Sequence, residues 1–353
     1  MTRPRQPPSS DQRSSGKMPR MRDVAAAANV SLTTVSVVLG EVPNSGIPEA
    51  TQERVRRTAE RLGYIPNVSA RSLRTMRSGA LGFLANGIAA SPFAGEMIRG
   101  AQAAAWERGY VLLIVDTGEI ERAEETEPAV RILLERRVEK VIVASLFHRE
   151  VEVPSALRAH RPILVDCYSK DHAYDAIVPD EEGGGYVATR RLLERQLLPV
   201  GIIRFPDSMP AGRGRFAGYQ RALGEVHLPV DPSLVEITTS GQAPEGYELA
   251  ARLLDRHPDL HSLFCANDRT AMGAYEAIRV RGLSVPGDIA VVGFDNQEII
   301  ATALIPGLTT VALPHYEMGV RAVQRVFESV AQAQDAPPRT ETTPCWLVAR
   351  DSA

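Results

Sequence analysis

The chain has 353 residues, which predicts more than one folding unit at about 150 residues per domain. Its hydrophobic content of 44% is ordinary for a globular protein, and no apolar run approaches the roughly 20 residues that cross a bilayer, which argues against an integral membrane protein. The formal net charge of −3 conceals an asymmetry, because residues 1–78 hold 13 Lys and Arg against 6 Asp and Glu (+7) and the remainder carries −10; a basic head on an acidic body is typical of a DNA-binding protein.

Residues 1–18 are polar and rich in Pro, Ser and Arg, so we expect a disordered basic tail. They lack the apolar segment of a secretory signal, which favours a cytoplasmic protein located with the nucleoid. The three cysteines are too far apart for a disulfide framework or a zinc site. His257 and His261 have the spacing of a metal pair on a helix, but Pro258 lies between them. We therefore predict no metal and no cofactor.

The next stretch predicts two short helices joined by a tight turn. Met21–Ala28 has one apolar stripe, and Ser31 is a suitable N-cap for a second helix, Leu32–Leu39. The second helix should pack through Val35, Val38 and Leu39, leaving Leu32, Thr33, Ser36 and Val37 pointing away. This is the pattern of a helix-turn-helix whose second helix fits the DNA major groove, although any small three-helix unit would look similar.

A third amphipathic helix is predicted at Glu49–Leu62, with Val55, Ala59 and Leu62 inward and Arg54, Arg56, Arg57 and Arg61 outward. Gly63 and Pro66 end it. The segment Asn67–Arg74 that follows has a helical pattern, but about eight residues are too few for a stable lone helix. It should fold only against a partner; the alternative is a plain linker.

From Gly79 onward, strands and helices alternate. Strands are predicted at 80–85, 111–115, 140–144, 163–165, 200–204, 234–237, 263–265 and 289–294, with helices at 94–108, 130–137, 185–193, 215–223, 246–254 and 270–281. Two successive series of this kind predict two parallel-sheet subdomains. Ligands bind such sheets beyond the carboxyl ends of their strands, so a cleft between the subdomains is the expected binding site.

The sequence carries no recognisable catalytic constellation: Glu181–Gly185 is glycine-rich but matches no phosphate-binding loop. Several polar or aromatic residues fall instead at strand ends, where the cleft would be: Ser91, Phe93, Arg213, Arg215, Asn267 and Asp295. Taken singly each of the polar ones is a helix cap or a turn residue. Their convergence on one crevice favours a ligand site.

Four motifs, in this order and spacing, resemble the lac-repressor/galactose-repressor family of bacterial transcription regulators. They are Asp23-Val24-Ala25, Val30-Ser31 with Thr34-Val35-Ser36, Leu62-Gly63-Tyr64-Ile65-Pro66-Asn67, and Ala70-Arg71-Ser72-Leu73-Arg74. The resemblance implies a helix-turn-helix head at 19–65, a hinge at 66–78, and a periplasmic-binding-protein-like effector and dimerisation domain at 79–353. Its N subdomain would span about 79–179 and 311–336, and its C subdomain about 180–306 and 342–353. Connections would cross near Pro179, at Pro306–Val311 and at Ala336–Thr342, and 346–349 would form a last strand in the C subdomain.

The resemblance also implies roles for particular residues. Leu32, Thr33, Ser36 and Val37 would face the major groove, with Thr34 near phosphate, and Leu32 and Val37 favour apolar contacts. Asn67, Ala70, Arg71 and Leu73 would belong to a hinge helix paired with its dimer mate in the minor groove, where Leu73 wedges between base pairs. The positions resembling Arg215, Asn267 and Asp295 would grip a polar effector, with Phe93 and Phe264 as an apolar wall; core packing is the alternative for Phe264. Asp166-Cys167 stands where the family usually has Asp-Arg.

We therefore expect a repressor that binds a palindromic operator in double-stranded DNA as a homodimer, with a tetramer left open, and that responds to a small effector, a sugar or sugar derivative. A solute-binding protein for transport is the alternative, which the head argues against. An enzyme on the same scaffold is a third, which the missing catalytic residues disfavour.

Overall fold

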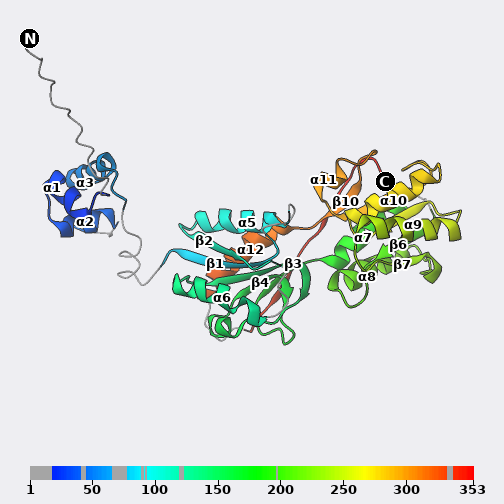
Figure 1. Ribbon diagram of the computed structural model, residues 1–353, viewed down its shortest axis with the longest axis horizontal. Helices are drawn as coiled ribbons and strands as arrows, with labels where there is room; N and C mark the ends of the chain where they lie inside the picture. Colours follow the sequence, from blue (N-terminus) through cyan, green and yellow to red (C-terminus); the bar gives the residue numbers. More distant parts are fainter. Residues whose placement is uncertain are drawn as a thin grey trace, which may run out of the picture. The chain divides into compact units, whose positions relative to one another are not determined.

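The computed structural model describes residues 18–40, 45–65, 78–88, 91, 94–118, 123–195, 198–331 and 337–353 (Figure 1). The chain divides into two compact units, Met1–Ser78 and Gly79–Ala353, which are described one at a time. The predicted tail and the predicted hinge segment Asn67–Arg74 lie outside the described residues. Among those residues, no helix is both long enough and apolar enough to cross a membrane.

The first unit contains α1 (Met21–Ala28), α2 (Leu32–Leu39) and α3 (Glu49–Leu62), with the bounds that the sequence predicts. Its core consists of the predicted inward residues and a few neighbours: Val24, Ala25, Ala28, Val35, Val38, Val55 and Ala59 are buried, and Leu39 and Leu62 pack against them. The Ser31 hydroxyl caps α2 by accepting a hydrogen bond from the Thr34 amide at 3.0 Å. Gly63 ends α3 with a left-handed φ of 65°, a conformation that glycine adopts without strain.

The second unit contains two six-stranded sheets. The first has the order β11-β5-β4-β3-β1-β2 and is parallel; the second has the order β12-β10-β9-β8-β6-β7, in which β12 is antiparallel to β10. The strands are β1 (Ala80–Asn86), β2 (Val111–Asp116), β3 (Val141–Glu150), β4 (Ile163–Tyr168), β5 (Ala176–Pro179), β6 (Val200–Arg204), β7 (Val235–Ile237), β8 (Ser262–Cys265), β9 (Ala290–Asp295), β10 (Thr309–Ala312), β11 (Thr340–Thr343) and β12 (Trp346–Val348). This is the predicted α/β architecture.

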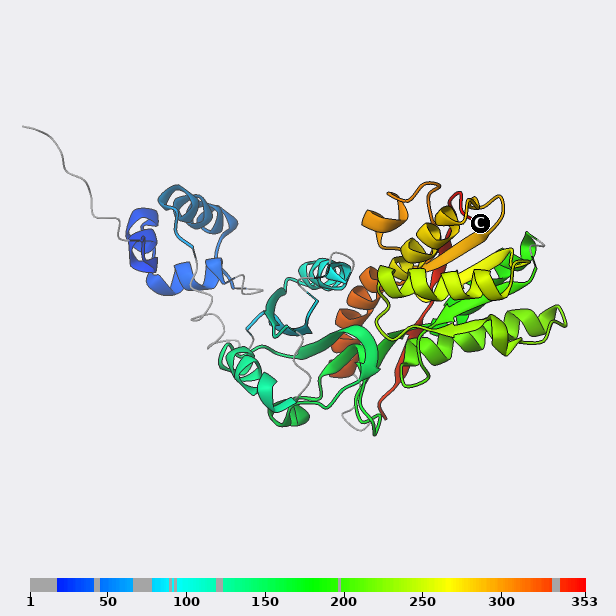
Figure 2. The ribbon, with the colours of Figure 1, turned by 45° about the vertical axis from the view of Figure 1, so that its right-hand side comes forward.

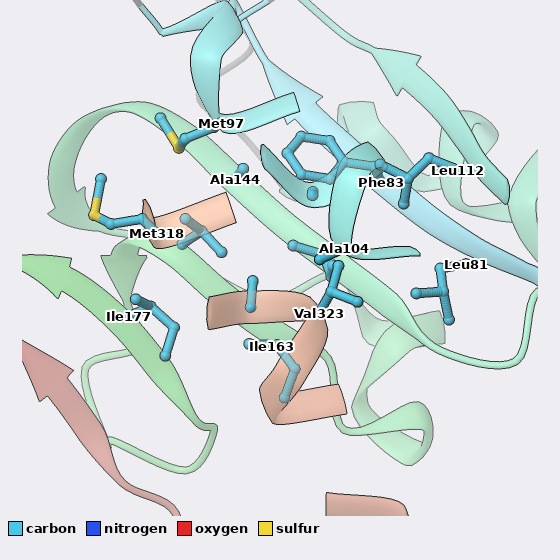
Figure 3. Close-up of a cluster of buried hydrophobic side chains, with 14 of the residues drawn as sticks. Leu81, Phe83, Met97, Ala104, Leu112, Ala144, Ile163, Ile177, Met318 and Val323 are labelled. Carbon is cyan, nitrogen blue, oxygen red and sulfur yellow. The ribbon is translucent and has the colours of Figure 1, made fainter. Parts of the chain in front are cut away.

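Helices cover both faces of each sheet. They are α5 (Gly95–Trp106), α6 (Ala123–Glu135), α7 (Glu181–Glu194), α8 (Pro210–Glu225), α9 (Ala243–Arg256), α10 (Asp268–Val280), α11 (Glu298–Ala301) and α12 (His315–Ala331), with short 3-10 helices at Ser155–His160 and Pro232–Leu234. On one face of the first sheet, Met97 of α5 and Met318 and Val323 of α12 pack against strand residues (Figure 3). Helix α12 therefore lies beside α5, although some 210 residues separate them in the chain (Figure 2).

The chain crosses between the two subdomains three times. The first crossing is at Asp180, next to the predicted Pro179. The second lies between β10 and α12, because β10 belongs to the second sheet and α12 packs on the first; this is after residue 312, later than the predicted Pro306–Val311. The third lies between β11 and β12, after the predicted Ala336–Thr342. The N subdomain therefore extends to β11, beyond the predicted bound of 336, while β12 returns to the C subdomain as predicted.

Several elements differ from the sequence prediction. The sequence reasoning missed β5, β10, β11 and α12 as elements, and it began α7 and α8 four to five residues too late, at Gly185 and Arg215 instead of Glu181 and Pro210. The missed strands have four residues each, too short to show a period of their own. The first turns of α7 and α8 contain glycines, which lower helix propensity but are required there, since a Cβ on Gly212 or Gly214 would collide with neighbouring atoms.

Candidate functional site

In the first unit, α2 presents one face to the core and another to solvent. Val35 and Val38 are buried, Leu32 is 53% exposed, and Thr33 is exposed. Thr34, Ser36 and Val37 are half-buried. An eight-residue helix with a capped N-terminus and an uncovered face has the dimensions of a major-groove reader. The other predicted DNA-binding residues, Asn67, Ala70, Arg71 and Leu73, lie outside the described residues.

The sequence predicts four outward-facing arginines in α3. In the structure, some of them are held by contacts within the first unit. Arg54 donates from Nε to the carbonyl oxygen of Ala28 at 3.1 Å and so fastens α3 to the end of α1. Arg57 pairs with Glu53 in the same helix at 2.8 Å, with both side chains exposed. Exposed pairs of this kind contribute little to stability. Arg54 is therefore part of the scaffold that holds α2 in place.

In the second unit, Arg215 of α8 lies at the centre of a buried polar cluster between the subdomains. Its Nε donates to Glu181 Oε2 at 2.8 Å, and its Nη1 donates to the Ala266 carbonyl at 2.5 Å. The same Nη1 lies 3.5 Å from Asp295 Oδ1. The guanidinium stacks 3.6 Å from the centre of the Phe294 ring, which gives a cation–π contact. Charge, hydrogen bonds and the ring together fix the orientation of Arg215.

Asp295 ends β9 and points into the same cluster. Its φ of 97° lies in a region that side-chain-bearing residues rarely adopt, so surrounding contacts must hold the backbone there. One contact is the Gln297 side chain, which donates to Asp295 Oδ2 at 3.1 Å. Burial raises the pKa of Asp295 to about 6, although the charge of Arg215 acts in the opposite direction.

Two residues that the sequence reasoning missed contribute from opposite subdomains. Glu181 opens α7 in the C subdomain, and His148 lies on β3 in the N subdomain, with Nδ1 3.7 Å from Glu181 Oε1. Burial acts to raise the pKa of Glu181, but the charge of Arg215 and the contact with His148 outweigh it and leave the pKa below its ordinary value. Glu181 was interpreted as part of a glycine-rich loop because nothing local marks it as the partner of an arginine 34 residues away.

Asp166 and His315 add a second contact on the N-subdomain side. Asp166 lies in the buried part of β4, is 2% exposed, and has a positive φ of 54°. His315 Nε2 lies 3.9 Å from Asp166 Oδ2. Burial raises the pKa of Asp166 to about 7 and lowers that of His315 to about 4, so the contact favours neutral groups and is not a strong ion pair.

The other predicted effector residues do not all reach the cluster. Asn267 is buried nearby, but its Oδ1 caps α10 by accepting from the Thr270 amide at 2.8 Å, which is the local role that the sequence left open. Arg213 is exposed and donates to the Asp207 carbonyl instead of joining Arg215. Phe264 is 1% exposed in the core with Phe294, so the expectation of a ligand wall there is wrong. Ser91 caps Ala94, and Phe93 lies outside the described residues.

Asp268, the neighbour of Asn267, organises the loop that carries Asp295. Its two carboxylate oxygens accept hydrogen bonds from the Gln297 amide at 2.6 Å and the Thr310 hydroxyl at 2.5 Å. Burial raises its pKa to about 8. The sequence places Asp268 beside Asn267 just after a predicted strand, where an Asp is also common for local reasons alone.

Two cavities reach the cluster from different sides. One, of about 860 Å³, contacts Asp295, Gln297 and His315 and extends to Arg269, Tyr316 and Trp346. The other, of about 520 Å³, is lined from the N subdomain by His148 and Tyr168 and from the C subdomain by Met209 and Arg213. Both are formed by residues of the two subdomains. A polar molecule of a few hundred cubic ångströms fits this volume range.

In the described part of the chain, neither a reactive thiol nor a metal-binding group adjoins the cluster. The three cysteines are buried, and burial raises the pKa of Cys167 to about 12, so that thiol is not an activated nucleophile. Within the described residues, no group of three or more His, Cys, Asp and Glu side chains has the geometry to hold a metal ion.

Comparison with known proteins gives two family matches. Residues 20–67 match the model of bacterial regulatory proteins of the lacI family, and residues 189–353 match that of a periplasmic binding protein-like domain. The HTH-type transcriptional regulator RegA of Clostridium saccharobutylicum is 32% identical over 87% of this chain and 91% of its own length. The HTH-type transcriptional repressor PurR of Vibrio atlanticus is 31% identical over 89% of this chain and 92% of its own length.

Solved structures give the same result along nearly the whole chain. The lac repressor dimer bound to operator and the anti-inducer ONPF matches with a TM-score of 0.77 and 25% identity, covering 95% of this chain and 99% of the other. The complex of the transcriptional regulator CelR with cellobiose matches with a TM-score of 0.65 and 28% identity, covering 95% of this chain and all of the other.

Proposed function

This chain belongs to the LacI family of bacterial regulatory proteins, and from this membership we propose its function. It is a DNA-binding transcriptional repressor whose operator affinity is controlled by a small effector. One observation supports this function above the others: the same chain contains a capped helix-turn-helix and a two-subdomain unit with a buried polar cluster between its sheets. The alternative is a solute-binding protein for transport, which would not need a DNA-reading helix such as α2.

The effector is a polar hydroxylated molecule of the carbohydrate class, bound between the subdomains. Arg215 and Asp295 support this, because a fork of donors beside a carboxylate suits the vicinal hydroxyls of a sugar ring. The CelR relative is in complex with cellobiose, which is in line with the same class. Asn267 is a further candidate contact through its amide nitrogen, since its oxygen is used in capping α10.

On DNA, the exposed face of α2 enters the major groove. Leu32 and Thr33 reach base edges first, with Ser36 and Val37 behind them and Thr34 near a phosphate. Leu32 and Val37 lack hydrogen-bonding groups, so they favour apolar contact such as that with thymine methyls. The hinge residues Asn67, Ala70, Arg71 and Leu73 order in the minor groove when two chains bind together.

Regulation follows from the three crossings between the subdomains. An effector that binds the two faces of the cleft changes the angle between the subdomains, and in a homodimer this alters the spacing of the two hinges. Coupling of this kind typically amounts to 1–3 kcal/mol. A dimer matches a palindromic operator, because each chain reads one half-site.

The test is duplex selection from a random DNA pool with the full-length chain, followed by gel-shift measurements with and without candidate sugars. Enrichment of a palindromic sequence is expected, with an effector changing its affinity about 5- to 150-fold. No preference among duplexes, with or without ligands, would favour the solute-binding alternative.

Asp295→Asn tests the effector site within the same assay. Asparagine has the same shape and tolerates positive φ, so the fold should persist. Operator binding should remain while effector affinity falls about 10- to 100-fold, the loss typical of a charged hydrogen bond. Asp259→Asn, at an exposed position, is the matched control. A normal effector response in Asp295→Asn would remove Asp295 from the site.

A further inference from the structure

In the cluster between the subdomains, buried carboxyl groups outnumber guanidinium groups. Asp166, Glu181 and Asp295 surround Arg215, and Asp268 lies directly behind Asp295. Arg269, on the β9 side, lines the larger cavity and is half-buried. Arg350 acts on Asp268 as well, so four carboxyl groups face three guanidinium groups. The rest of that cavity adds Glu96, Glu298 and Glu317 against Arg99, which makes the imbalance larger.

The hydrogen bonds show the same imbalance. Arg215 already donates to Glu181 and to the Ala266 carbonyl, so much of its donor capacity is used within the protein. Asp166 Oδ1 is buried and accepts no hydrogen bond within the described part of the chain. A buried acceptor without a donor costs free energy, and a ligand that supplies the donor recovers it. The site therefore offers acceptors and selects ligands that donate.

Charge decides which donors fit best. A neutral hydroxyl satisfies an acceptor but does not compensate the charge of a buried carboxyl group that ionises. An ammonium group satisfies the acceptor and also neutralises the charge, whereas a carboxylate or phosphate on the ligand would add to the repulsion. The raised pKa values of Asp166 and Asp295 agree with this, because both groups hold protons that a ligand cation would replace.

We propose that the effector is a hydroxylated compound carrying a protonated amino group, such as an amino sugar, whose ammonium is held by Asp295 and Asp166. The inference rests on the proposed function, since it names the chemical class that the regulatory cleft takes. Asp295 lines the larger cavity and meets the ligand directly. Asp166 lies on the N-subdomain side behind His315, which lines the same cavity and has its Nε2 3.9 Å from Asp166 Oδ2, so an ammonium reaches Asp166 past His315. One ammonium between carboxylates of the two subdomains would hold the cleft closed.

The test uses the full-length chain and matched sets of ligands that differ only in charge: glucosamine, glucose and glucuronate, with the corresponding galactose and mannose series. Calorimetric titration and thermal unfolding are expected to show that, in at least one series, the amine binds about tenfold or more tightly than the neutral sugar and that the acid binds least. Equal or tighter binding by a neutral or acidic member overturns the proposal. So does the absence of binding by every member.

Asp166→Asn separates charge from shape. Asparagine tolerates the positive φ at this position, so the backbone is preserved. The variant should lose about tenfold or more of its affinity for the amine and little for the neutral sugar, while Asp259→Asn at the surface changes neither. An unchanged preference for the amine in Asp166→Asn would overturn the role of Asp166.

The pH dependence gives an independent readout. The charged and titratable groups that face Asp166 are His148, Glu181, Arg215, Asp295 and His315. Between about pH 5 and about pH 7, where the amine of the ligand stays protonated, Asp166 begins to ionise; over this range the wild-type affinity for the amine should rise with pH, and Asp166→Asn should show a weaker rise. A flat wild-type profile would contradict the proposal. Operator binding is measured on the same samples: if it persists while the charge preference fails, the regulator remains and only this inference falls.

Discussion

At the scale of single residues, Arg215 joins three segments that are distant in the sequence. It contacts Glu181 at the start of α7, the carbonyl of Ala266 after β8, and Asp295 at the end of β9. None of these contacts is local, and each depends on burial for its strength, because solvent would screen the charges and compete for the hydrogen bonds. The cluster is therefore a structural support of the C subdomain as well as a candidate ligand site.

The first prediction concerns Arg215→Ala. Removing the guanidinium leaves Glu181 and Asp295 buried without their cation, which typically costs about 3–5 kcal/mol. The free energy of unfolding, measured by chemical denaturation of the second unit's transition, should fall by that amount. Arg213→Ala, two residues earlier and exposed, is the matched control and should change it by less than about 0.5 kcal/mol. Similar losses in both variants would mean that the cluster contributes no special stability.

The second prediction concerns pH and Asp166. Its folded-state pKa of about 7 lies above the ordinary carboxyl value, so the folded protein binds this proton more tightly than the unfolded chain does. The resulting stabilisation is complete below about pH 4 and is lost as the pH rises through about 7. Asp166→Asn cannot titrate, so the wild type should lose stability relative to this variant between about pH 5 and about pH 8. Parallel stability curves from denaturant titrations at these pH values would contradict the assignment.

At the scale of elements, the close contact of α5 with α12 holds the second half of the chain onto the first sheet. A Cβ on Gly319 would lie 2.1 Å from the Met97 carbonyl oxygen, and one on Gly100 would lie 2.0 Å from that of Tyr316. The two glycines thus permit backbone contact between the helices where any side chain would force them apart. The reason for these glycines is the packing and not a turn, since neither has a positive φ.

The third prediction is that Gly319→Ala destabilises the second unit by about 1–3 kcal/mol or more, the range for overpacking a close contact. Gly224→Ala is the matched control, because this glycine is also helical, in the last turn of α8, and a Cβ there meets nothing within 4 Å. That variant should be neutral or more stable by up to about 1 kcal/mol, since alanine favours helix. Thermal and chemical unfolding measure the stability of both variants. Equal changes in Gly319→Ala and Gly224→Ala would show that α5 and α12 can move apart without loss of stability.

At the scale of the whole molecule, function requires a reader of DNA and a sensor of small molecules to act together. The basic charge of residues 1–78 and the acidic charge of the remainder separate these roles along the chain. Phosphate attraction gives nonspecific affinity to the basic part, whereas base contacts and DNA deformation provide specificity. The predicted hinge would contribute to specificity, because it deforms the DNA.

The fourth prediction concerns this hinge, which lies outside the described residues. Leu73→Ala removes the apolar wedge expected in the minor groove but no positive charge, so binding to the selected operator should weaken by about 2 kcal/mol, the order of the free energy of burying one leucine side chain. Nonspecific binding and its salt dependence should remain nearly unchanged. Gel shifts on operator and scrambled duplexes at several salt concentrations measure both. Equal losses on the two duplexes would argue against the wedge.

The sequence by itself determined the local features. The bounds of α1, α2 and α3 follow from caps and apolar periodicity within a few residues of each boundary. The alternation of strands and helices predicts two sheets, which in the structure are parallel except for β12. Asp295 could be named from the sequence because it follows an apolar run, and Arg215 because it stands at the predicted start of a helix that comes after a strand. These patterns involve residues close together in the sequence, so they can be recognised without knowledge of the fold.

Only the tertiary structure decided which residues meet. Glu181 meets Arg215 because α7 packs against α8 within the C subdomain, and the crossings bring His148 and Asp166 to the same cluster from the N subdomain. Arg213, in contrast, turns to solvent and Phe264 enters the core. The short strands β10 and β11 and the exact crossings were likewise hidden, since a four-residue strand is stabilised by its neighbours and not by its own pattern. The pKa and the ligand preference of a buried ionisable group depend on partners that lie far away in the chain. For that reason the chemistry of the cleft could not be obtained from the sequence alone.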